Sequence, residues 1–234
     1  MGTRELSIRT QQLFSRYTRM AWAAKMTAAQ IAGLAAVISP ILFQGIVTVV
    51  QLLQPGHDPV RDTISSMVWG AFGWLQTAGF YLLGFSLIVW TVKLYFATNG
   101  KVYRTGITIL AVIGAGFVLL GIFPSQTPGA VRTIQAIIHG RIVSAISLLF
   151  PLVCFTLALL LWRHRHFRGL SLYTGATGVV ALGLIGVGIV TLITGNHGIF
   201  GMLERVFLLN GLTWVEVTGL QLLPVASLDC SQLS

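Results

Sequence analysis

Long apolar runs fill most of the sequence, and short polar segments separate them. Six runs have close to the roughly 20 residues that a helix needs to cross the hydrocarbon core of a bilayer. Because the connections are short, neighbouring helices are expected to be antiparallel. The predicted transmembrane helices cover residues 28–53, 67–97, 104–123, 133–162, 170–194 and 202–224. The pattern therefore predicts an all-α polytopic membrane protein, with six transmembrane helices in a compact bundle over residues 28–224.

Residues 1–27 are more polar and are predicted to form a separate basic segment. Apolar side chains such as Leu13 and Tyr17 recur at helical spacing over residues 6–25, and arginines are offset from them. This pattern is typical of an amphipathic helix that lies in the membrane interface, and a solvated tail is the alternative. Residues 225–234 are predicted to be a short C-terminal tail.

The composition excludes a soluble protein. Hydrophobic residues make up 55% of the 234 residues and charged residues only 9%, whereas a soluble domain has roughly 25% charged residues. The mean hydropathy is +0.82. A net charge of +9 would suggest nucleic-acid binding in a soluble protein. Here the basic residues lie mainly in short loops between apolar runs, so membrane lipids are the expected partners and nucleic acid is not.

The distribution of basic residues predicts the orientation. Eleven of the 15 Lys and Arg residues lie in the N-terminal segment and around the turns that follow the second and fourth predicted helices. The other four are Arg61, Arg132, Arg141 and Arg205. Since positively charged loops remain in the cytoplasm, both termini are expected there, in a multi-pass protein of the plasma membrane. The four remaining arginines are then extracytoplasmic.

The stretch HDPVRDTISSMVWG, residues 57–70, concentrates charge immediately before the second apolar run. Asp58 is followed by a proline, which is typical of an N-cap and the first position of a helix. If a helix begins there, four polar side chains share one of its faces because of their spacing. They are Asp58, Arg61, Asp62 and Ser65. A polar stripe is therefore expected directly above the apolar body of the second span.

Further polar residues are predicted at the same depth, around the starts of the fourth and sixth spans. Arg132 and His139 are seven residues apart and are expected on one helix face, with Arg141 nearby. Ionisable groups near the membrane are costly unless they are paired, so these groups should face one another or water. The candidate binding cluster comprises His57, Asp58, Arg61, Asp62, Ser65, Arg132, His139, Arg141, His197, Glu204 and Arg205.

Three interpretations of this cluster stay open. The first is a network of ion pairs that holds the outer helix ends together. The second is a polar pocket in which Arg61, Arg132 and Arg141 bind an anionic group, with His139 and Asp62 available for proton chemistry. The third is a metal site. The histidines and aspartates are zinc-ligand types, but no H-E-x-x-H or other local ligand spacing accompanies them, and no metal is predicted.

Cofactors and covalent chemistry have little support in the sequence. Cys154 and Cys230 give neither a disulfide framework nor a metal-ligand spacing. Only His139 lies within a predicted span, so a single-histidine haem or pigment ligand stays open there and the cofactor is unknown. A nucleophile such as Ser65 or Ser125 needs a base within hydrogen-bond reach, and no G-x-S-x-G elbow is present.

Glu216 lies within the sixth predicted span, in LTWVEVTGL. A lone carboxylate at membrane depth is a functional-site hypothesis by default. Its expected partners are Asn210, Thr213 or Lys93. The alternative is a neutral carboxyl that hydrogen-bonds across helices.

Several of these motifs together resemble a known family. HDPVRDTIS ahead of GWLQ, GIFPSQTPG after the third span, HG at 139–140 and LERVFLL followed by Trp214 look like the bacterial and archaeal membrane proteins grouped as domain of unknown function 998. The resemblance covers about residues 28–222. It implies a six-helix integral membrane protein and carries over no catalytic residue. The family-like polar residues are Asp58, Arg61, Asp62, Ser65, His139, Glu204 and Arg205.

This chain departs from that family pattern at two places. Members often carry an acid shortly after the FP of the loop between the third and fourth spans, whereas this chain has Ser125 and Gln126. If that acid helps to form a site in relatives, the site is altered here. Glu216 is also unusual for a span that is otherwise apolar.

The sequence favours a non-enzymatic role, either as an accessory or scaffolding subunit of a larger membrane complex or as a protein that binds lipid or another amphiphile. One alternative is a small proton-coupled transporter that uses Arg61, His139 and Glu216. Another is a membrane-embedded hydrolase that acts on lipid at the outer leaflet.

Overall fold

Helices account for all the regular structure in the described part of the chain. The computed structural model describes residues 31–97, 101–127, 129–195 and 197–222. The long helices are Ile31–Leu53, α2 (Gly73–Ala97), α3 (Lys101–Ile122), α4 (Ile134–Trp162), α5 (Arg168–Ile193) and α6 (Phe200–Leu222). The short 3₁₀-helices are η1 (Ile64–Trp69), η2 (Arg165–Phe167) and η3 (His197–Ile199). The predicted all-α class is confirmed, whereas the predicted segments 1–27 and 225–234 lie outside the described residues.

Five of the long helices are long and apolar enough to cross a membrane. They are Ile31–Leu53, Gly73–Phe96, Tyr103–Ile122, Ile134–Trp162 and Arg168–Ile193. These helices indicate a multi-pass membrane protein. α6 has 23 residues, but it carries Glu204, Arg205 and Glu216 and is less apolar than the others. The sixth predicted span is therefore present as a long helix, while five helices qualify as candidate spans by length and composition.

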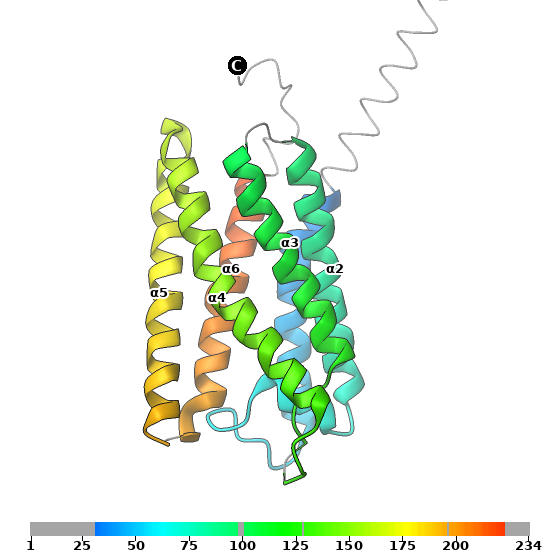
Figure 1. Ribbon diagram of the computed structural model, residues 1–234. Helices are drawn as coiled ribbons and strands as arrows, with labels where there is room; N and C mark the ends of the chain where they lie inside the picture. The colour runs from blue at the N-terminus through cyan, green and yellow to red at the C-terminus, as the bar shows by residue number, and fades with distance from the viewer. Residues whose placement is uncertain (1–30, 98–100, 128, 196, 223–234) are drawn as a thin grey trace, which may run out of the picture.

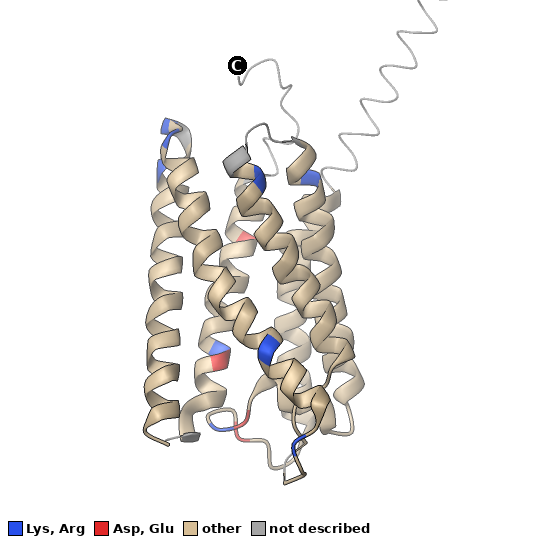
Figure 2. Ribbon diagram, in the orientation of Figure 1, with Lys and Arg blue, Asp and Glu red and all other residues tan. Residues whose placement is uncertain are grey.

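The helices stand side by side, and α4 runs obliquely across the others (Figure 1). We name the two ends of the bundle after the short helices found there. The η2 end holds the turn between α4 and α5, and the η1 end holds η1 and the turn between α5 and α6. Charged residues gather toward these two ends and leave most of the middle uncharged, although α6 carries charge at two levels (Figure 2).

Glycines bring the backbones of α2 and α3 into contact. A β-carbon at Gly84 would lie 2.7 Å from the carbonyl oxygen of Gly114, and one at Gly114 would lie 3.1 Å from the carbonyl oxygen of Gly84. Helices in lipid associate through this kind of close packing, because burial of apolar surface gives little driving force there. These two helices therefore form a closely packed hairpin.

The first helix packs antiparallel against α6, although the two are far apart in the sequence. Arg205 near the start of α6 reaches Gln51 near the end of the first helix. Further along, a β-carbon at Gly219 would lie 3.2 Å from the Val37 side chain. α6 is thus held along most of its length by the first helix.

α4 and α5 meet at the η2 end and separate toward the η1 end (Figure 1). Near η2 they are in contact, since Ser171 Oγ donates a hydrogen bond of 2.7 Å to the carbonyl of Ala158. In the same half of the bundle, the Trp214 indole N–H of α6 donates to Thr174 Oγ1 of α5 at 3.1 Å. The contacts that join these three helices lie in the η2 half, and the η1 half is left more open.

The prediction of a helix that starts at Asp58 and continues into the span 67–97 is wrong. Residues 57–63 form turns, η1 follows, and α2 begins only at Gly73. A β-carbon at Gly73 would collide with the carbonyl oxygen of Val68, so the chain turns a tight corner that glycine permits. The apolar run hides this corner because it continues from η1 into α2.

Candidate functional site

Arg205 of α6 is the centre of the polar structure at the η1 end. Its guanidinium has five N–H groups, and all of its nitrogens have acceptors in the structure. The acceptors are Gln51 Oε1 at 3.0 and 3.2 Å, His57 Nε2 at 2.8 Å, and the carbonyl oxygens of Pro59 at 2.8 Å, Asp62 at 2.8 Å and Gly201 at 3.0 Å. Arg205 therefore ties together the end of the first helix, the turn 57–63 and the start of α6. We call Gln51, His57, Pro59, Asp62, Gly201 and Arg205 the Arg205 clamp.

His57 lies between the arginine and an aspartate of the clamp. Its Nε2 is 2.8 Å from Arg205 Nη2, so this ring nitrogen must be unprotonated to accept the hydrogen bond. Its Nδ1 lies 3.7 Å from Asp62 Oδ2, and its side chain is only 3% exposed. Burial lowers the pKa of His57 and the charge of Arg205 lowers it further, while Asp62 and Asp58 oppose the shift. The imidazole is accordingly neutral at pH 7, with its proton on Nδ1 facing Asp62.

The turn 57–63 is closed by its own carboxylates and docked onto α6. Asp58 Oδ1 accepts a hydrogen bond of 2.9 Å from the backbone N–H of Val60, so Asp58 caps a single turn. The carbonyl of Val60 then accepts 3.0 Å from the backbone N–H of Met202 in α6. Within the described part of the chain Arg61 contacts only Asp58, at 3.6 Å on the surface, where an ion pair contributes about 1 kcal/mol or less. The predicted helix does not continue, because the carbonyl groups that its next turn would use accept hydrogen bonds from α6 instead.

Gly201 permits this docking. A β-carbon there would collide with the carbonyl oxygen of Asp62 and would lie 2.8 Å from that of Pro59. The turn therefore rests directly on the α6 backbone.

Glu204, which precedes Arg205 in α6, holds η1 against this helix. Its Oε2 accepts 2.6 Å from the backbone N–H of Ile64, and its Oε1 accepts 2.9 Å from Ser65 Oγ. The carbonyl of Ser65 in turn accepts 2.8 Å from Ser125 Oγ, and Trp69 Nε1 donates 3.1 Å to the carbonyl of Ser125. Through this chain of hydrogen bonds, Glu204 connects α6 with η1 and with the loop that follows α3.

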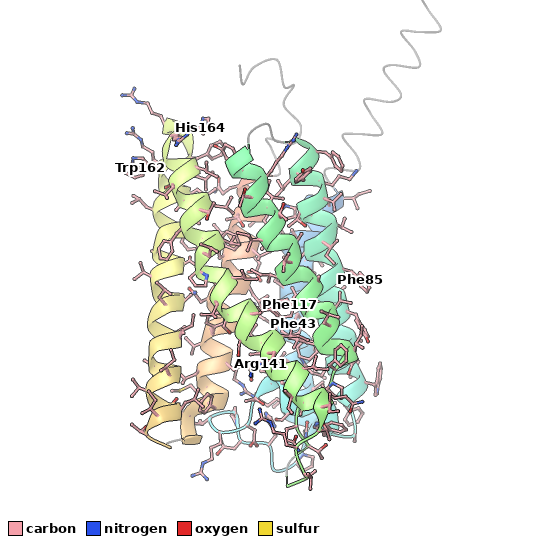
Figure 3. All side chains as sticks on the ribbon, viewed as in Figure 1. Phe43, Phe85, Phe117, Arg141, Trp162 and His164 are labelled. Atoms are coloured by element: carbon pink, nitrogen blue, oxygen red, sulfur yellow. The ribbon has the colours of Figure 1, made fainter. Side chains whose placement is uncertain are left out.

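A cavity of about 410 Å³ lies beside Glu204, between α4, α5 and α6. Its wall comes from the first half of α4, the second half of α5 and the first half of α6, so it occupies the η1 half of the bundle. Phe80 of α2 and Phe117 of α3 form part of the wall, and Phe117 is labelled in Figure 3. The lining is mostly apolar. Glu204, Ser65 and Thr63 contribute polar groups where the cavity meets η1. We call this space the α4–α6 cavity.

The structure brings seven of the eleven predicted cluster residues together and separates three of them. The seven are His57, Asp58, Arg61, Asp62, Ser65, Glu204 and Arg205. No contact among the described residues joins Arg132, His139 or Arg141 to this group. The eleventh, His197, lies in η3, and its side chain is outside the described part of the structure.

The three separated residues have different surroundings. Arg132 precedes the first residue of α4, Ile134, so the prediction that it shares a helix face with His139 is wrong. The helix begins after Thr133, whose hydroxyl accepts 3.2 Å from the backbone N–H of Ala136 and serves as the N-cap. His139 is buried, with Nδ1 2.7 Å from the carbonyl of Phe123. Arg141 is exposed on α4.

Glu216 has a partner that the sequence prediction missed. Gln44 Nε2 of the first helix donates to Glu216 Oε1 at 3.4 Å. Asn210, a predicted partner, instead donates to the carbonyl of Thr177 in α5. Gln44 and Gln51 are polar interruptions of an apolar run, and that was the available signal that the first helix faces the charged helix α6.

The geometry also bears on metal binding, on the cysteines and on a serine nucleophile. Within the described residues, no group of three or more His, Cys, Asp or Glu side chains is placed to hold a metal ion. Cys154 is buried and unpaired in the core, and Cys230 lies outside the described residues. A serine nucleophile needs a base within hydrogen-bond reach and a third group that orients this base. Ser65 has the first of these, because the Glu204 carboxylate lies within hydrogen-bond reach.

Comparison with known proteins supports the motif-based resemblance. A family model described as "Protein of unknown function (DUF998)" matches residues 15–221. Neither the curated proteins nor the solved structures contain a match to this chain. The matched range includes the Arg205 clamp, the Glu204 contacts and the whole lining of the α4–α6 cavity. The chain belongs to the DUF998 family of proteins of unknown function.

Proposed function

We propose that this protein crosses the plasma membrane six times, with both termini in the cytoplasm, and binds an amphiphile in the α4–α6 cavity. The observation that carries the proposal is an apolar cavity of about 410 Å³ with a carboxyl and a hydroxyl group where it meets η1. Ligand sites typically measure 300–1,000 Å³ and combine apolar walls with a few polar groups. The walls suit a hydrocarbon chain, and Glu204 with Ser65 suits a polar head.

The charges of α6 are compatible with a sixth span. Arg205 is fully hydrogen-bonded within the clamp, Glu204 accepts two hydrogen bonds, and Glu216 contacts Gln44. Paired charges inside a bundle are tolerated at membrane depth, whereas unpaired charges facing lipid are not. We therefore assign α6 as a span whose polar groups face protein.

The basic residues support cytoplasmic termini. The η2 end carries Lys93, Lys101, Arg104, Arg163, Arg165 and Arg168, and the chain ahead of the first helix adds five more basic residues. Four arginines remain toward the η1 end. The excess of positive charge assigns the η2 end to the cytoplasm. The α4–α6 cavity then lies in the outer half of the membrane.

Lateral access supports an amphiphile from the bilayer as the ligand. α4 and α5 separate toward the η1 end (Figure 1), and both contribute to the cavity wall there. Leu148 of α4 and Leu192 of α5 line the cavity and are also exposed at the surface of the bundle. A chain from the outer leaflet can enter between these helices without crossing water.

The proposal is tested by filling the cavity from a position that has room for a side chain. Gly188 of α5 lines the cavity, and a β-carbon there would meet nothing within 4 Å. Gly183 on the same helix is equally open but lies outside the lining. Gly188→Trp should remove co-purifying amphiphile, measured by lipid mass spectrometry after purification in a mild detergent. Gly183→Trp is the matched control and should retain it.

Equal amounts of amphiphile on both variants and on the wild type would contradict the proposal. The same purification tests a role as an accessory subunit, because a partner protein in a fixed ratio would be detected with the chain. Binding an amphiphile and serving a larger complex are separate properties, and the cavity supports only the first.

A hydrolase is the second candidate, because Ser65 Oγ lies 2.9 Å from Glu204 Oε1 beside the same cavity. In such an enzyme Glu204 would take the proton of Ser65 as the hydroxyl attacks a lipid ester. A fluorophosphonate probe that labels the wild type but not Ser65→Ala would favour this candidate. No labelling of Ser65 would exclude Ser65 as a nucleophile and leave the binding role in place.

A further inference from the structure

Arg141 stands out among the charged groups at the η1 end because it is an exposed arginine inside a candidate span and has no ion-pair partner in the described structure. It is exposed and lies seven residues inside α4, which is about 10 Å along the helix axis. The surrounding segment, Ile134–Trp162, is a candidate span. An exposed guanidinium at such a depth is costly unless it reaches an anion or water.

Arg141 lies on the same helix stripe as residues that line the α4–α6 cavity. Ser144 and Leu148 both belong to the lining, and they follow Arg141 by three and seven residues. Residues at this spacing occupy one face of a helix. Figure 3 labels Arg141 on the part of α4 that has diverged from α5. Its spacing from Ser144 and Leu148 places it beside the lining residues of α4, although Arg141 is not itself part of the lining.

The α6 side of the cavity carries the complementary charge. Glu204 is part of the lining together with Ser65. In Figure 2, the basic position on α4 and the neighbouring acidic and basic positions near the start of α6 stand at a similar level of the bundle. Arg205, the basic residue on α6, has its donors occupied by the clamp. An entering head group therefore meets a free cation on one side and an acceptor on the other.

We infer that the cavity selects an amphiphile whose head joins a phosphate to a hydrogen-bond donor, as in a phosphoethanolamine head. This inference rests on the proposed function. Arg141 pairs with the phosphate, since guanidinium groups bind phosphate oxygens through strong charge-assisted hydrogen bonds. The ammonium donates toward the Glu204 carboxyl and Ser65. A head with an anion alone would place negative charge beside Glu204 without a compensating donor.

The cavity, at about 410 Å³, lies near the lower end of the roughly 300–1,000 Å³ range of ligand sites. We therefore expect it to hold one acyl chain. The second chain of a phospholipid would remain between α4 and α5, in the bilayer.

The test compares three probes with the same chain and different heads, using the full protein stripped of lipid in a neutral detergent. The probes are myristoyl lysophosphatidylethanolamine, myristoyl lysophosphatidylcholine and monomyristoyl glycerol. Binding is measured by titration in native mass spectrometry. We expect the ethanolamine lipid to bind about tenfold more tightly than the glyceride, as one charge-assisted contact predicts. The choline lipid should bind more weakly than the ethanolamine lipid, because its nitrogen has no N–H to donate.

Two variants test whether Arg141 produces the preference for the ethanolamine lipid. Arg141→Gln should bring the ethanolamine lipid to within about twofold of the glyceride and leave glyceride binding unchanged. Arg132→Gln is the matched control, because Arg132 is also an exposed arginine on this side but precedes α4. It should keep the tenfold preference. Excess inorganic phosphate should not displace the lipid, since it has no chain, and displacement would show a site for free anions instead.

The outcomes separate this inference from the proposed function. Equal binding of all three probes, blocked by Gly188→Trp, would refute head-group selection and leave amphiphile binding intact. An unchanged preference in Arg141→Gln would refute the role of Arg141. No binding of any probe to the wild type, with Gly188→Trp indistinguishable from it, would refute the proposed function itself.

Discussion

Replacing Arg205 with lysine keeps the positive charge and removes the planar guanidinium. Lysine has three N–H donors where arginine has five. The five acceptor groups of the clamp are one side-chain amide, one imidazole and three backbone carbonyls. Arg205→Lys therefore leaves at least two of them without a donor, even if every lysine N–H finds one.

The expected loss of stability follows from those unpaired groups. Each buried acceptor left without a partner costs about 1–3 kcal/mol, and the clamp is only half-buried, so the lower value applies. Two to three groups then cost about 2–3 kcal/mol. For a chain of this size, each kcal/mol lowers the Tm by about 2–4 °C, which gives a decrease of about 4–12 °C.

The assay is thermal unfolding in a mild detergent, followed by intrinsic tryptophan fluorescence. Arg132→Lys is the control, since Arg132 is exposed and precedes α4; it should unfold within about 2 °C of the wild type. If Arg205→Lys unfolds as late as this control, then the six contacts of Arg205 contribute little, and the clamp does not hold the η1 end together.

Three further predictions concern Gly201, His57 and Glu216. Gly201→Ala should lower the free energy of unfolding by about 1–3 kcal/mol, because the added methyl group collides with the docked turn. Gly183→Ala, at an open helical site, should raise it by about 0.5–1 kcal/mol. Thermal unfolding of both variants checks that the two effects have opposite signs. Stability should fall as the pH drops below about 6.5, because the lowered pKa of His57 means that the unfolded chain binds the proton more readily; His57→Gln should weaken that dependence between pH 7 and 5.5. Glu216→Gln keeps an acceptor for Gln44 and should change the Tm by less than about 2 °C, while amphiphile binding, measured by lipid mass spectrometry, stays at the wild-type level.

The helical architecture could be predicted because membrane spans have a long and strong hydrophobic signal. The predicted start at residue 133 lies next to the observed start of α4 at Ile134, since Thr133 gives a local N-cap. The start of α2 could not be predicted in the same way. The corner at Gly73 depends on a contact with Val68 across a short gap, and Gly70 and Gly73 resemble the many glycines that lie within the other apolar runs.

The candidate site was predictable in its residue types and only partly in its contacts. Asp58, Asp62, Glu204 and Arg205 could be grouped because each lies at the same end of an apolar run. Which carbonyls Arg205 would bind could not be predicted, because that depends on how the turn rests on Gly201. The α4–α6 cavity was not predictable at all, since it arises from the angle between α4 and α5 rather than from any local pattern.

The most direct measurement of the central claim is an experimental structure of the protein in nanodiscs formed from the native membrane. We predict elongated density that enters between α4 and α5, fills the α4–α6 cavity and ends beside Glu204 and Ser65. A cavity closed by the approach of α4 to α6, or one that contains only ordered water, would contradict amphiphile binding.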